Sequence, residues 1–258
     1  MLPTPSTSHV NIDRVYEPSE DSFLLMDTLS SPSEIEFLTR RFGESSAQGR
    51  LSSSLLIFEV GTGSGVVLAF VTSQAKAIFG TSDILTLGTD LNQFACSSSL
   101  ETVKRYSHDA GQIASSQFLG VLQADLVSPV RPGVIDVLIF NPPYVPSDGI
   151  PRLKGECQGS GDNTQRESDS HLLSMSYEGG QDGMEITTTL LNQLRWVLNS
   201  EKGVAYVLLC QQNKPAKVIN QLRNCEAAWI VDVVGRSGVQ AGWEQLQILR
   251  ICRPVRRK

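Results

Sequence analysis

Four consecutive residues, Asn141-Pro142-Pro143-Tyr144, are the most distinctive chemical feature of the sequence. Proline fixes its own φ and restricts the residue before it, so the two prolines hold Asn141 and Pro142 in an extended conformation. Neither proline carries an N–H, and the loop therefore presents acceptors: the side-chain oxygen of Asn141 and the carbonyl of Pro142. Such a pair can bind both hydrogens of one planar NH2 group, and the ring of Tyr144 can lie against a flat group beside that NH2. A rigid turn after a strand is the alternative explanation.

An amide or aromatic amino nitrogen is a poor nucleophile because its lone pair is delocalised. Holding its two hydrogens favours pyramidalisation and aims the lone pair at an electrophile, such as the methyl group of a positively charged sulfonium donor. The protein then has mainly to align atoms about 3–3.5 Å apart. No general base is required before attack, and we expect His9, His108 and His171 to be bystanders because none follows a predicted strand.

A glycine-rich segment, Glu59-Val-Gly61-Thr-Gly63-Ser-Gly65, ends an apolar run. Its glycines allow a tight turn and a close approach of the backbone to a ligand, although a purely structural turn would use them equally well. A dinucleotide fingerprint would need glycine where Val66 stands, and no Lys-Ser or Lys-Thr follows. An acidic residue just before the turn, Glu59, suits a cationic or amino-bearing ligand better than a pyrophosphate.

Two further carboxylates end apolar runs. Asp90 could accept hydrogen bonds from a ribose diol, or it could cap a helix. Asp125, followed by Leu126, is placed to accept a hydrogen bond from an adenine amino group. The alternative is that Asp125 is a solvated carboxylate in a turn. Ligands bind beyond the carboxyl ends of parallel strands, so these residues, the glycine turn and Asn141 are expected to share one crevice.

Apolar runs and periodic segments alternate along the chain, which predicts a mostly parallel sheet with helices on both faces. The predicted strands are 55–60, 84–89, 118–124, 134–140, 204–210, 229–234 and 244–252, the last two forming an antiparallel hairpin at one edge. Helices are predicted at 19–29, 66–79, 92–106, 186–198 and 218–225, with Asn92 as an N-cap. Segments 30–54 and 147–176, rich in small polar residues, are expected to be surface loops.

Composition narrows the class of protein. The chain has 258 residues, 40% hydrophobic and 19% charged, with a formal net charge of −5. An acidic balance argues against a dedicated duplex-DNA binder, and no apolar run is long enough to span a membrane. Five scattered cysteines form no Cys-x-x-Cys pair, so no metal site is expected and a reducing compartment is indicated: the cytoplasm, with the nucleus as an alternative.

Together these motifs resemble the class I S-adenosylmethionine-dependent methyltransferases, which implies a Rossmann-like seven-stranded α/β fold. Within them the chain resembles the HemK-type glutamine methyltransferases that modify translation release factors. Segment Val15-Tyr-Glu-Pro-Ser-Glu-Asp-Ser-Phe23 is similar to the opening signature of the eukaryotic branch, with Ser22 in place of a threonine. Glu178-Gly-Gly-Gln-Asp-Gly183 resembles the segment after the catalytic loop. The resemblance covers most of residues 13–253 and implies one domain, 1–258, whose residues 1–13 and insert 147–176 we expect to be flexible.

The resemblance implies a role for each matching residue. The cofactor S-adenosylmethionine would be bound by Ser22, Glu59, Gly61, Gly63, Asp90, Asp125, Leu126 and Asn141. Asn141 and the Pro142 carbonyl would hold the substrate NH2, with Pro143 and Tyr144 beside it. The implied substrate is the glutamine of the Gly-Gly-Gln motif of the class-1 release factor. A small zinc-binding activator subunit would pair with the third-strand edge, Gln117 to Gln123.

Four alternatives stay open. Methylation of an adenine amino group would require a flipped base and a basic surface, for which the chain has no spare domain. Lysine methylation is less suited to acceptors arranged for a planar NH2. A non-catalytic scaffold with this fold would tolerate loss of Asn141. A nicotinamide dehydrogenase is disfavoured by Val66.

Overall fold

The computed structural model describes residues 2–43, 54–109, 118–151, 162–227, 229–238 and 245–253. Within them, a single seven-stranded sheet has the order β3-β2-β1-β4-β5-β7-β6. The strands are β1 (Leu55–Val60), β2 (Ile84–Asp90), β3 (Phe118–Gln123), β4 (Val137–Phe140), β5 (Val204–Cys210), β6 (Ile230–Arg236) and β7 (Leu246–Cys252).

Strands β1 to β5 pair in parallel, whereas β7 is antiparallel to both β5 and β6. The predicted antiparallel hairpin is therefore confirmed, with β7 inserted between β5 and β6. The chain order reverses between β1 and β4, and a crevice forms at such a switch point. This is the architecture of the class I methyltransferases, as expected from the sequence.

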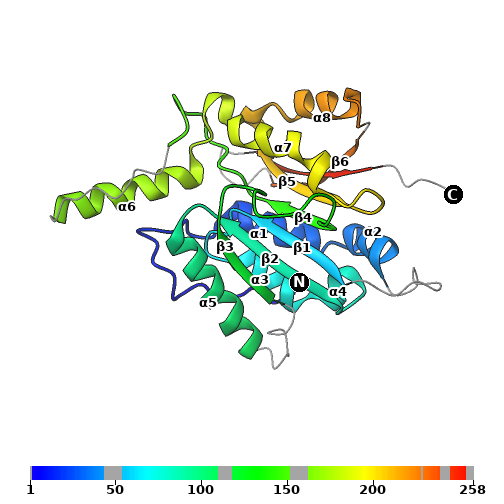
Figure 1. Ribbon diagram of the computed structural model, residues 1–258, viewed down its shortest axis with the longest axis horizontal. Helices are drawn as coiled ribbons and strands as arrows, with labels where there is room; N and C mark the ends of the chain where they lie inside the picture. Colours follow the sequence, from blue (N-terminus) through cyan, green and yellow to red (C-terminus); the bar gives the residue numbers. More distant parts are fainter. Residues whose placement is uncertain are drawn as a thin grey trace.

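Helices cover both faces of the sheet (Figure 1). They are α1 (Glu20–Leu29), α2 (Pro32–Phe42), α3 (Val66–Ser73), α4 (Ala75–Phe79), α5 (Gln93–Asp109), α6 (Asp162–Tyr177), α7 (Glu185–Val197) and α8 (Pro215–Asn224), with short 3-10 turns η3 (Gln181–Gly183) and η4 (Gln211–Asn213). One core packs α1 to α4 against Ile57, Ile139 and Tyr206, and the other packs α7 and α8 against Phe58 and Leu138. Neighbouring strand residues thus point to opposite layers, as the pleat requires.

Three predicted elements need correction. Segment 30–54 is not simply a loop, because it contains the helix α2, which begins at Pro32. The side chain of Ser31 caps this helix by accepting from Glu34 N, and the helix buries Leu38 and Phe42. Residues 44–53 lie outside the described part. The helix expected at 66–79 is broken at Gln74 into α3 and α4, and the strand expected at 134–140 is regular only from Val137.

Segment 147–176, which was expected to be a surface loop, also contains a helix. Helix α6 occupies its second half and runs to Tyr177, extending away from the sheet in Figure 1; residues 152–161 lie outside the described part. The N-terminal segment, expected to be flexible, makes defined contacts with α5: Tyr106 Oη donates to Pro3 O (2.7 Å), and His9 Nε2 lies 3.1 Å from Thr102 Oγ1. In the described ranges, no helix is both long and apolar enough to cross a membrane.

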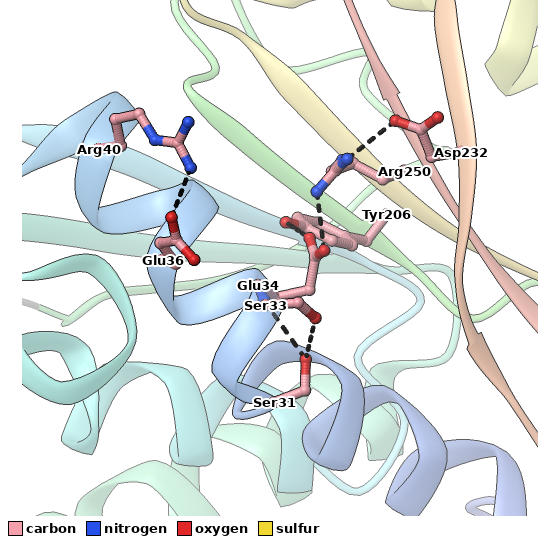
Figure 2. A network of polar contacts seen from close by, with 8 residues as sticks. All are labelled: Ser31, Ser33, Glu34, Glu36, Arg40, Tyr206, Asp232 and Arg250. Atoms are coloured by element: carbon pink, nitrogen blue, oxygen red, sulfur yellow. Dashed lines mark hydrogen bonds and ion pairs between the residues drawn. The ribbon is translucent and has the colours of Figure 1, made fainter.

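A buried polar network fixes α2 to the antiparallel side of the sheet (Figure 2). Glu34 accepts from Tyr206 Oη and from Arg250, both at 2.7 Å, and Arg250 also donates to Asp232 (2.8 Å). The Arg250 guanidinium lies 3.8 Å from the centroid of the Phe37 ring. Burial and the adjacent Glu34 carboxylate raise the pKa of Tyr206 well above its usual value. Because every charge in the network has a partner, it can remain in an apolar core.

Candidate active site

A cavity of about 590 Å³ opens at the carboxyl ends of the parallel strands, the size of a typical small-molecule site. Every residue that the sequence analysis proposed for cofactor or substrate lines it. These are Ser22, Glu59, Gly61, Gly63, Asp90, Asp125, Leu126, Asn141, Pro142, Pro143 and Tyr144. Strands β1, β2 and β4 and the turn after β3 bring all of them except Ser22 to one edge of the sheet, as the rule for parallel sheets predicts, and Ser22 reaches the cavity from α1.

The glycine-rich turn between β1 and α3 forms the floor of this cavity. Gly65 has φ +79°, and a Cβ built on it would lie 2.5 Å from Ser99 Cα, so a side chain there would push α5 away. Ser99 Oγ donates to Thr62 Oγ1 (2.9 Å) and to Gly63 O (3.0 Å). The turn therefore needs glycine both for its left-handed backbone and for its contact with α5.

Asp90 is the last residue of β2, and its side chain contacts the backbone on both sides of the cavity floor. Its carboxylate accepts from Gly63 N (2.9 Å) and from Asn92 N (2.8 Å), which ties the glycine turn to the start of α5. Asn92 in turn caps that helix by accepting from Phe94 N (2.9 Å), which confirms the predicted N-cap. The helix cap is therefore Asn92, while Asp90 lines the cavity, and its contact with a ribose stays a prediction. Burial raises the pKa of Asp90, and these backbone N–H groups oppose the rise.

Glu59 is a buried carboxylate, and one of its two oxygens lacks a hydrogen-bond partner among the described residues. It is 3% exposed, and within the described ranges its Oε2 has no hydrogen-bond partner. Burial, with a smaller contribution from Asp90, raises its pKa well above the usual value. A buried acceptor facing a cavity without a partner fits a ligand that carries N–H or ammonium donors.

Asp125 and Leu126 form the turn after β3. Asp125 is exposed at the cavity rim, while Leu126 has a left-handed φ of +46°. Thr89 Oγ1 donates to Leu126 O (2.7 Å) and holds this backbone in place. A left-handed non-glycine residue at a cavity wall is the kind of local strain that accumulates at ligand sites.

The Asn141-Pro142-Pro143-Tyr144 loop follows β4 and lies in the same cavity. Asn141 Nδ2 donates to Asp21 Oδ2 (3.0 Å), whereas Asn141 Oδ1 is buried and has no partner in the described part of the chain. Asn141 lines the cavity, and its role as an acceptor for a substrate amide stays a prediction. An unsatisfied buried oxygen costs about 1–3 kcal/mol, which a donor from a bound molecule would offset.

The back of this loop is held by residues that sequence reasoning did not assign to the site. Asn213, in η4 after β5, donates from Nδ2 to Tyr144 O (2.9 Å). Gly179 N donates to Val145 O (2.8 Å), and a Cβ on Gly183 would lie 2.0 Å from Tyr144 O. The glycines belong to a segment already noted by resemblance, but no local pattern marks Asn213, which is 69 positions from Tyr144.

Two segments flank the cavity mouth. Val15 and Tyr16 line it from the N-terminal side, and Met175 and Tyr177 of α6 line it from the other. Arg14 Nε lies 3.1 Å from Asp169 Oδ1, so an ion pair joins these segments. Two exposed apolar side chains, Ile150 and Tyr177, are among the residues that line the cavity.

Among the described residues, β3 is an edge strand of the sheet. Leu119 is 56% exposed and Leu122 is 43% exposed, so the apolar edge expected at 117–123 is confirmed for residues 118–123. Gln117 lies outside the described residues. An exposed apolar edge strand is a pairing site that proteins normally cover.

Comparison with known proteins places the chain among methyltransferases, although no family model matches it. It is 32% identical over 98% of its length to the eRF1 methyltransferase catalytic subunit mtq2 of Schizosaccharomyces pombe, covering 96% of that protein. It is 27% identical to methyltransferase HEMK2 of Homo sapiens, with 96% of this chain and 95% of the relative covered.

The solved structure of the E. cuniculi Mtq2–Trm112 complex, responsible for methylation of the eRF1 termination factor, has the same fold. Its matching chain superposes with a TM-score of 0.53 at 21% identity, covering 93% of this chain and 99% of that one. The fold and the nearly full-length likeness to mtq2 agree with the residues gathered in the cavity. The chain belongs to the HemK-type methyltransferase family, in the eukaryotic branch that contains Mtq2 and HEMK2.

Proposed function

We propose that this chain transfers a methyl group from S-adenosylmethionine to the side-chain amide nitrogen of a glutamine, in the Gly-Gly-Gln motif of the eukaryotic class-1 release factor. The observation that carries the proposal is Asn141, which lines the same cavity as Glu59 and Asp90 and whose buried Oδ1 has no partner in the part of the chain that the structure describes. The printed name of mtq2, an eRF1 methyltransferase, supports the choice of substrate. Because termination occurs on the ribosome, a cytoplasmic location is part of the proposal.

One half of the cavity would hold S-adenosylmethionine, and its side chains offer acceptors for the donor groups of that cofactor. Glu59 and Asp90 would accept from its amino and ribose hydroxyl groups, and Asp125 would accept from the adenine amino group. Ser22, Gly61, Gly63 and Leu126 complete this wall. When bound, S-adenosylmethionine supplies the electrophilic methyl carbon.

The substrate half orients the nucleophile. Asn141 Oδ1 and the Pro142 carbonyl would each accept one hydrogen of the glutamine NH2, which directs the nitrogen lone pair toward the cofactor side. Pro143 and Tyr144 would pack along the glutamine side chain. Alignment supplies most of the rate enhancement in such a site, because two molecules react as if they were one.

The β3 edge is the proposed docking site for a small zinc-binding activator subunit. The structurally similar E. cuniculi protein was solved as a complex with Trm112, which supports a partner of this type. A strand added at β3 would cover Leu119 and Leu122 and satisfy the free backbone groups of that edge.

The test is transfer of a tritiated methyl group by the chain co-purified with its activator. Release factor should be labelled, and release factor with the motif glutamine replaced by alanine should not. The variant Asn141→Ala should lose methyl transfer while its affinity for S-adenosylhomocysteine stays within about tenfold, because one acceptor among several is removed. Equal labelling of the glutamine-free substrate, or labelling of DNA or histone controls instead, would refute the proposal.

A further inference from the structure

Asp21 lies in the first turn of α1 and belongs to none of the cofactor or substrate roles proposed above. It is 3% exposed and lines the cavity, whereas its neighbour Glu20 is exposed to solvent. An acidic residue in a first helical turn ordinarily stabilises the helix dipole from the surface. Burial of Asp21 against the catalytic loop indicates a more specific role.

Both carboxylate oxygens of Asp21 have donors. Oδ1 accepts from Ser22 N (2.6 Å) and from Ser22 Oγ (3.2 Å), while Oδ2 accepts from Asn141 Nδ2 (3.0 Å). The Ser22 donor is a backbone N–H at the start of a helix, so its direction is fixed by the fold. The carboxylate is thus held from α1, and it reaches the side chain that follows β4.

An ionised carboxylate can only accept hydrogen bonds, so it must face the NH2 end of the Asn141 amide. The oxygen end then faces the other way, where it is buried and, among the described residues, has no hydrogen-bond partner. If the amide were reversed, the cavity would receive two N–H donors, which repel the NH2 of an incoming amide. The choice between an acceptor and a donor at this point of the cavity therefore depends on Asp21.

We propose that Asp21 is a positioning residue that fixes the amide orientation of Asn141, so that Oδ1 accepts from the substrate amide. This inference rests on the proposed function. Asp21 acts through Asn141, and the substrate does not need to touch it.

The isosteric variant Asp21→Asn gives the sharpest test. Ser22 N–H still requires an acceptor, so the new amide must turn its oxygen toward Ser22 and its NH2 toward Asn141. Asn141 must then reverse its own amide to accept, which leaves its NH2 in the cavity. At saturating cofactor we expect kcat for release factor to fall by about 10- to 100-fold, since the nucleophile is no longer held in line. Asp21→Ala should lower kcat in the same direction by removing the acceptor.

The matched control is Glu20→Gln, the same chemical change one residue earlier on an exposed position, which should leave kcat unchanged. Each variant is measured as the complex with its activator. Affinity for S-adenosylhomocysteine by calorimetry and the thermal unfolding midpoint provide readouts besides activity. For Asp21→Asn we expect cofactor affinity within threefold of the parent, because the proposal gives Asp21 no cofactor contact.

The outcomes separate the competing roles. A cofactor affinity that falls while kcat at saturation is retained would make Asp21 a cofactor ligand and overturn the proposal. An unfolding midpoint that falls with kcat unchanged would make its role structural and would also overturn it. If Asp21→Ala does not fold, Asp21→Asn alone decides.

Failure of this inference can be distinguished from failure of the proposed function. If Asn141→Ala abolishes methyl transfer but Asp21→Asn does not impair it, only the positioning role is wrong. If Asn141→Ala keeps full activity, the amide-holding role itself is wrong, whatever Asp21 does. In the Asn141→Ala background, adding Asp21→Asn should not weaken binding of a Gly-Gly-Gln peptide any further, because the two residues act in series.

Discussion

Asn213 donates its side-chain amide to the carbonyl of Tyr144, with 2.9 Å between Nδ2 and the oxygen. The same nitrogen lies 2.9 Å from Asp182 O, and Asn213 Oδ1 accepts from Cys210 N (2.8 Å). One side chain, 2% exposed, thus joins the end of β5, the turn η3 and the Asn141–Tyr144 loop. The cavity wall that holds the proposed substrate is therefore fixed from behind by the sheet itself.

Replacing Asn213 by alanine should destabilise the protein and slow methyl transfer. The variant leaves the carbonyls of Tyr144 and Asp182 and the Cys210 N–H without this partner, and each buried unsatisfied group costs about 1–3 kcal/mol. Chemical denaturation should show a lower free energy of unfolding, and kcat should fall because the loop loses its support. The control is Asn224→Ala, an exposed asparagine at the end of α8. A kcat equal to that of the parent would show that the loop holds its shape without Asn213.

Gly183→Ala should displace the Asn141–Tyr144 loop. Gly183 has φ +66°, and its added Cβ would lie 2.0 Å from Tyr144 O, far closer than any real contact. Backbone strain and steric overlap both act there, so we expect a loss of more than about 1 kcal/mol in stability together with reduced turnover.

The matched control for that variant is Gly149→Ala, since among the described residues nothing lies within 4 Å of a Cβ built at Gly149. It should leave both the unfolding midpoint and kcat unchanged. Comparable kinetics for Gly183→Ala and Gly149→Ala would contradict the contact between η3 and the loop.

The fold could be predicted well where local signals agree. Strands β1 and β5 begin and end at the predicted residues because their apolar runs are bounded by turn residues. Helix α2 was missed because the serines around it suggested a loop, although Ser31-Pro32 is a typical helix start. Its Glu34 is buried against Tyr206 and Arg250, partners more than 170 positions away that no local window contains.

Some residues of the candidate site could be predicted from the sequence and others could not. Residues at the carboxyl ends of strands, such as Glu59, Asp90 and Asn141, could be predicted because a parallel sheet brings strand ends together. Asp21 and Asn213 could not, since their roles depend on hydrogen bonds to residues 120 and 69 positions away. Long-range pairing of this kind is a property of the folded chain and leaves no pattern in a single sequence.

Glu59→Gln should stabilise the cofactor-free protein and weaken cofactor binding. Burial holds the pKa of Glu59 well above 4.5, so the folded protein keeps this proton at pH values where the unfolded chain has lost it. Stability from this group is complete below the unfolded pKa and is lost as pH rises through the folded pKa. Glutamine has no proton to lose, and the unfolding midpoint of the variant should therefore exceed that of the parent.

The pH dependence of that gain is the decisive measurement. It should be larger at pH 7.5 than at pH 5, because ionised Glu59 is penalised only as pH rises. Calorimetry should show weaker binding of S-adenosylhomocysteine, since the acceptor for its ammonium loses its charge. A stability change that is the same at both pH values would mean that packing, and not ionisation, distinguishes the two side chains.

Leu122→Lys should prevent assembly with the activator subunit without unfolding the chain. Leu122 is 43% exposed on the edge strand β3, so lysine can point its charge into solvent, whereas a partner strand packed there would bury it. Co-purification of the tagged activator should fall sharply, and methyl transfer to release factor should fall with it.

Trp196→Lys is the control for that experiment, because Trp196 is 59% exposed on α7 and gains the same charge away from the edge strand. It should retain both the activator and its activity. If Leu122→Lys also retains the activator, docking does not use β3, and the exposed edge must be covered in another way. If it loses the activator but stays monodisperse and fully active, the partner is not needed for catalysis, and the activator part of the proposal is wrong.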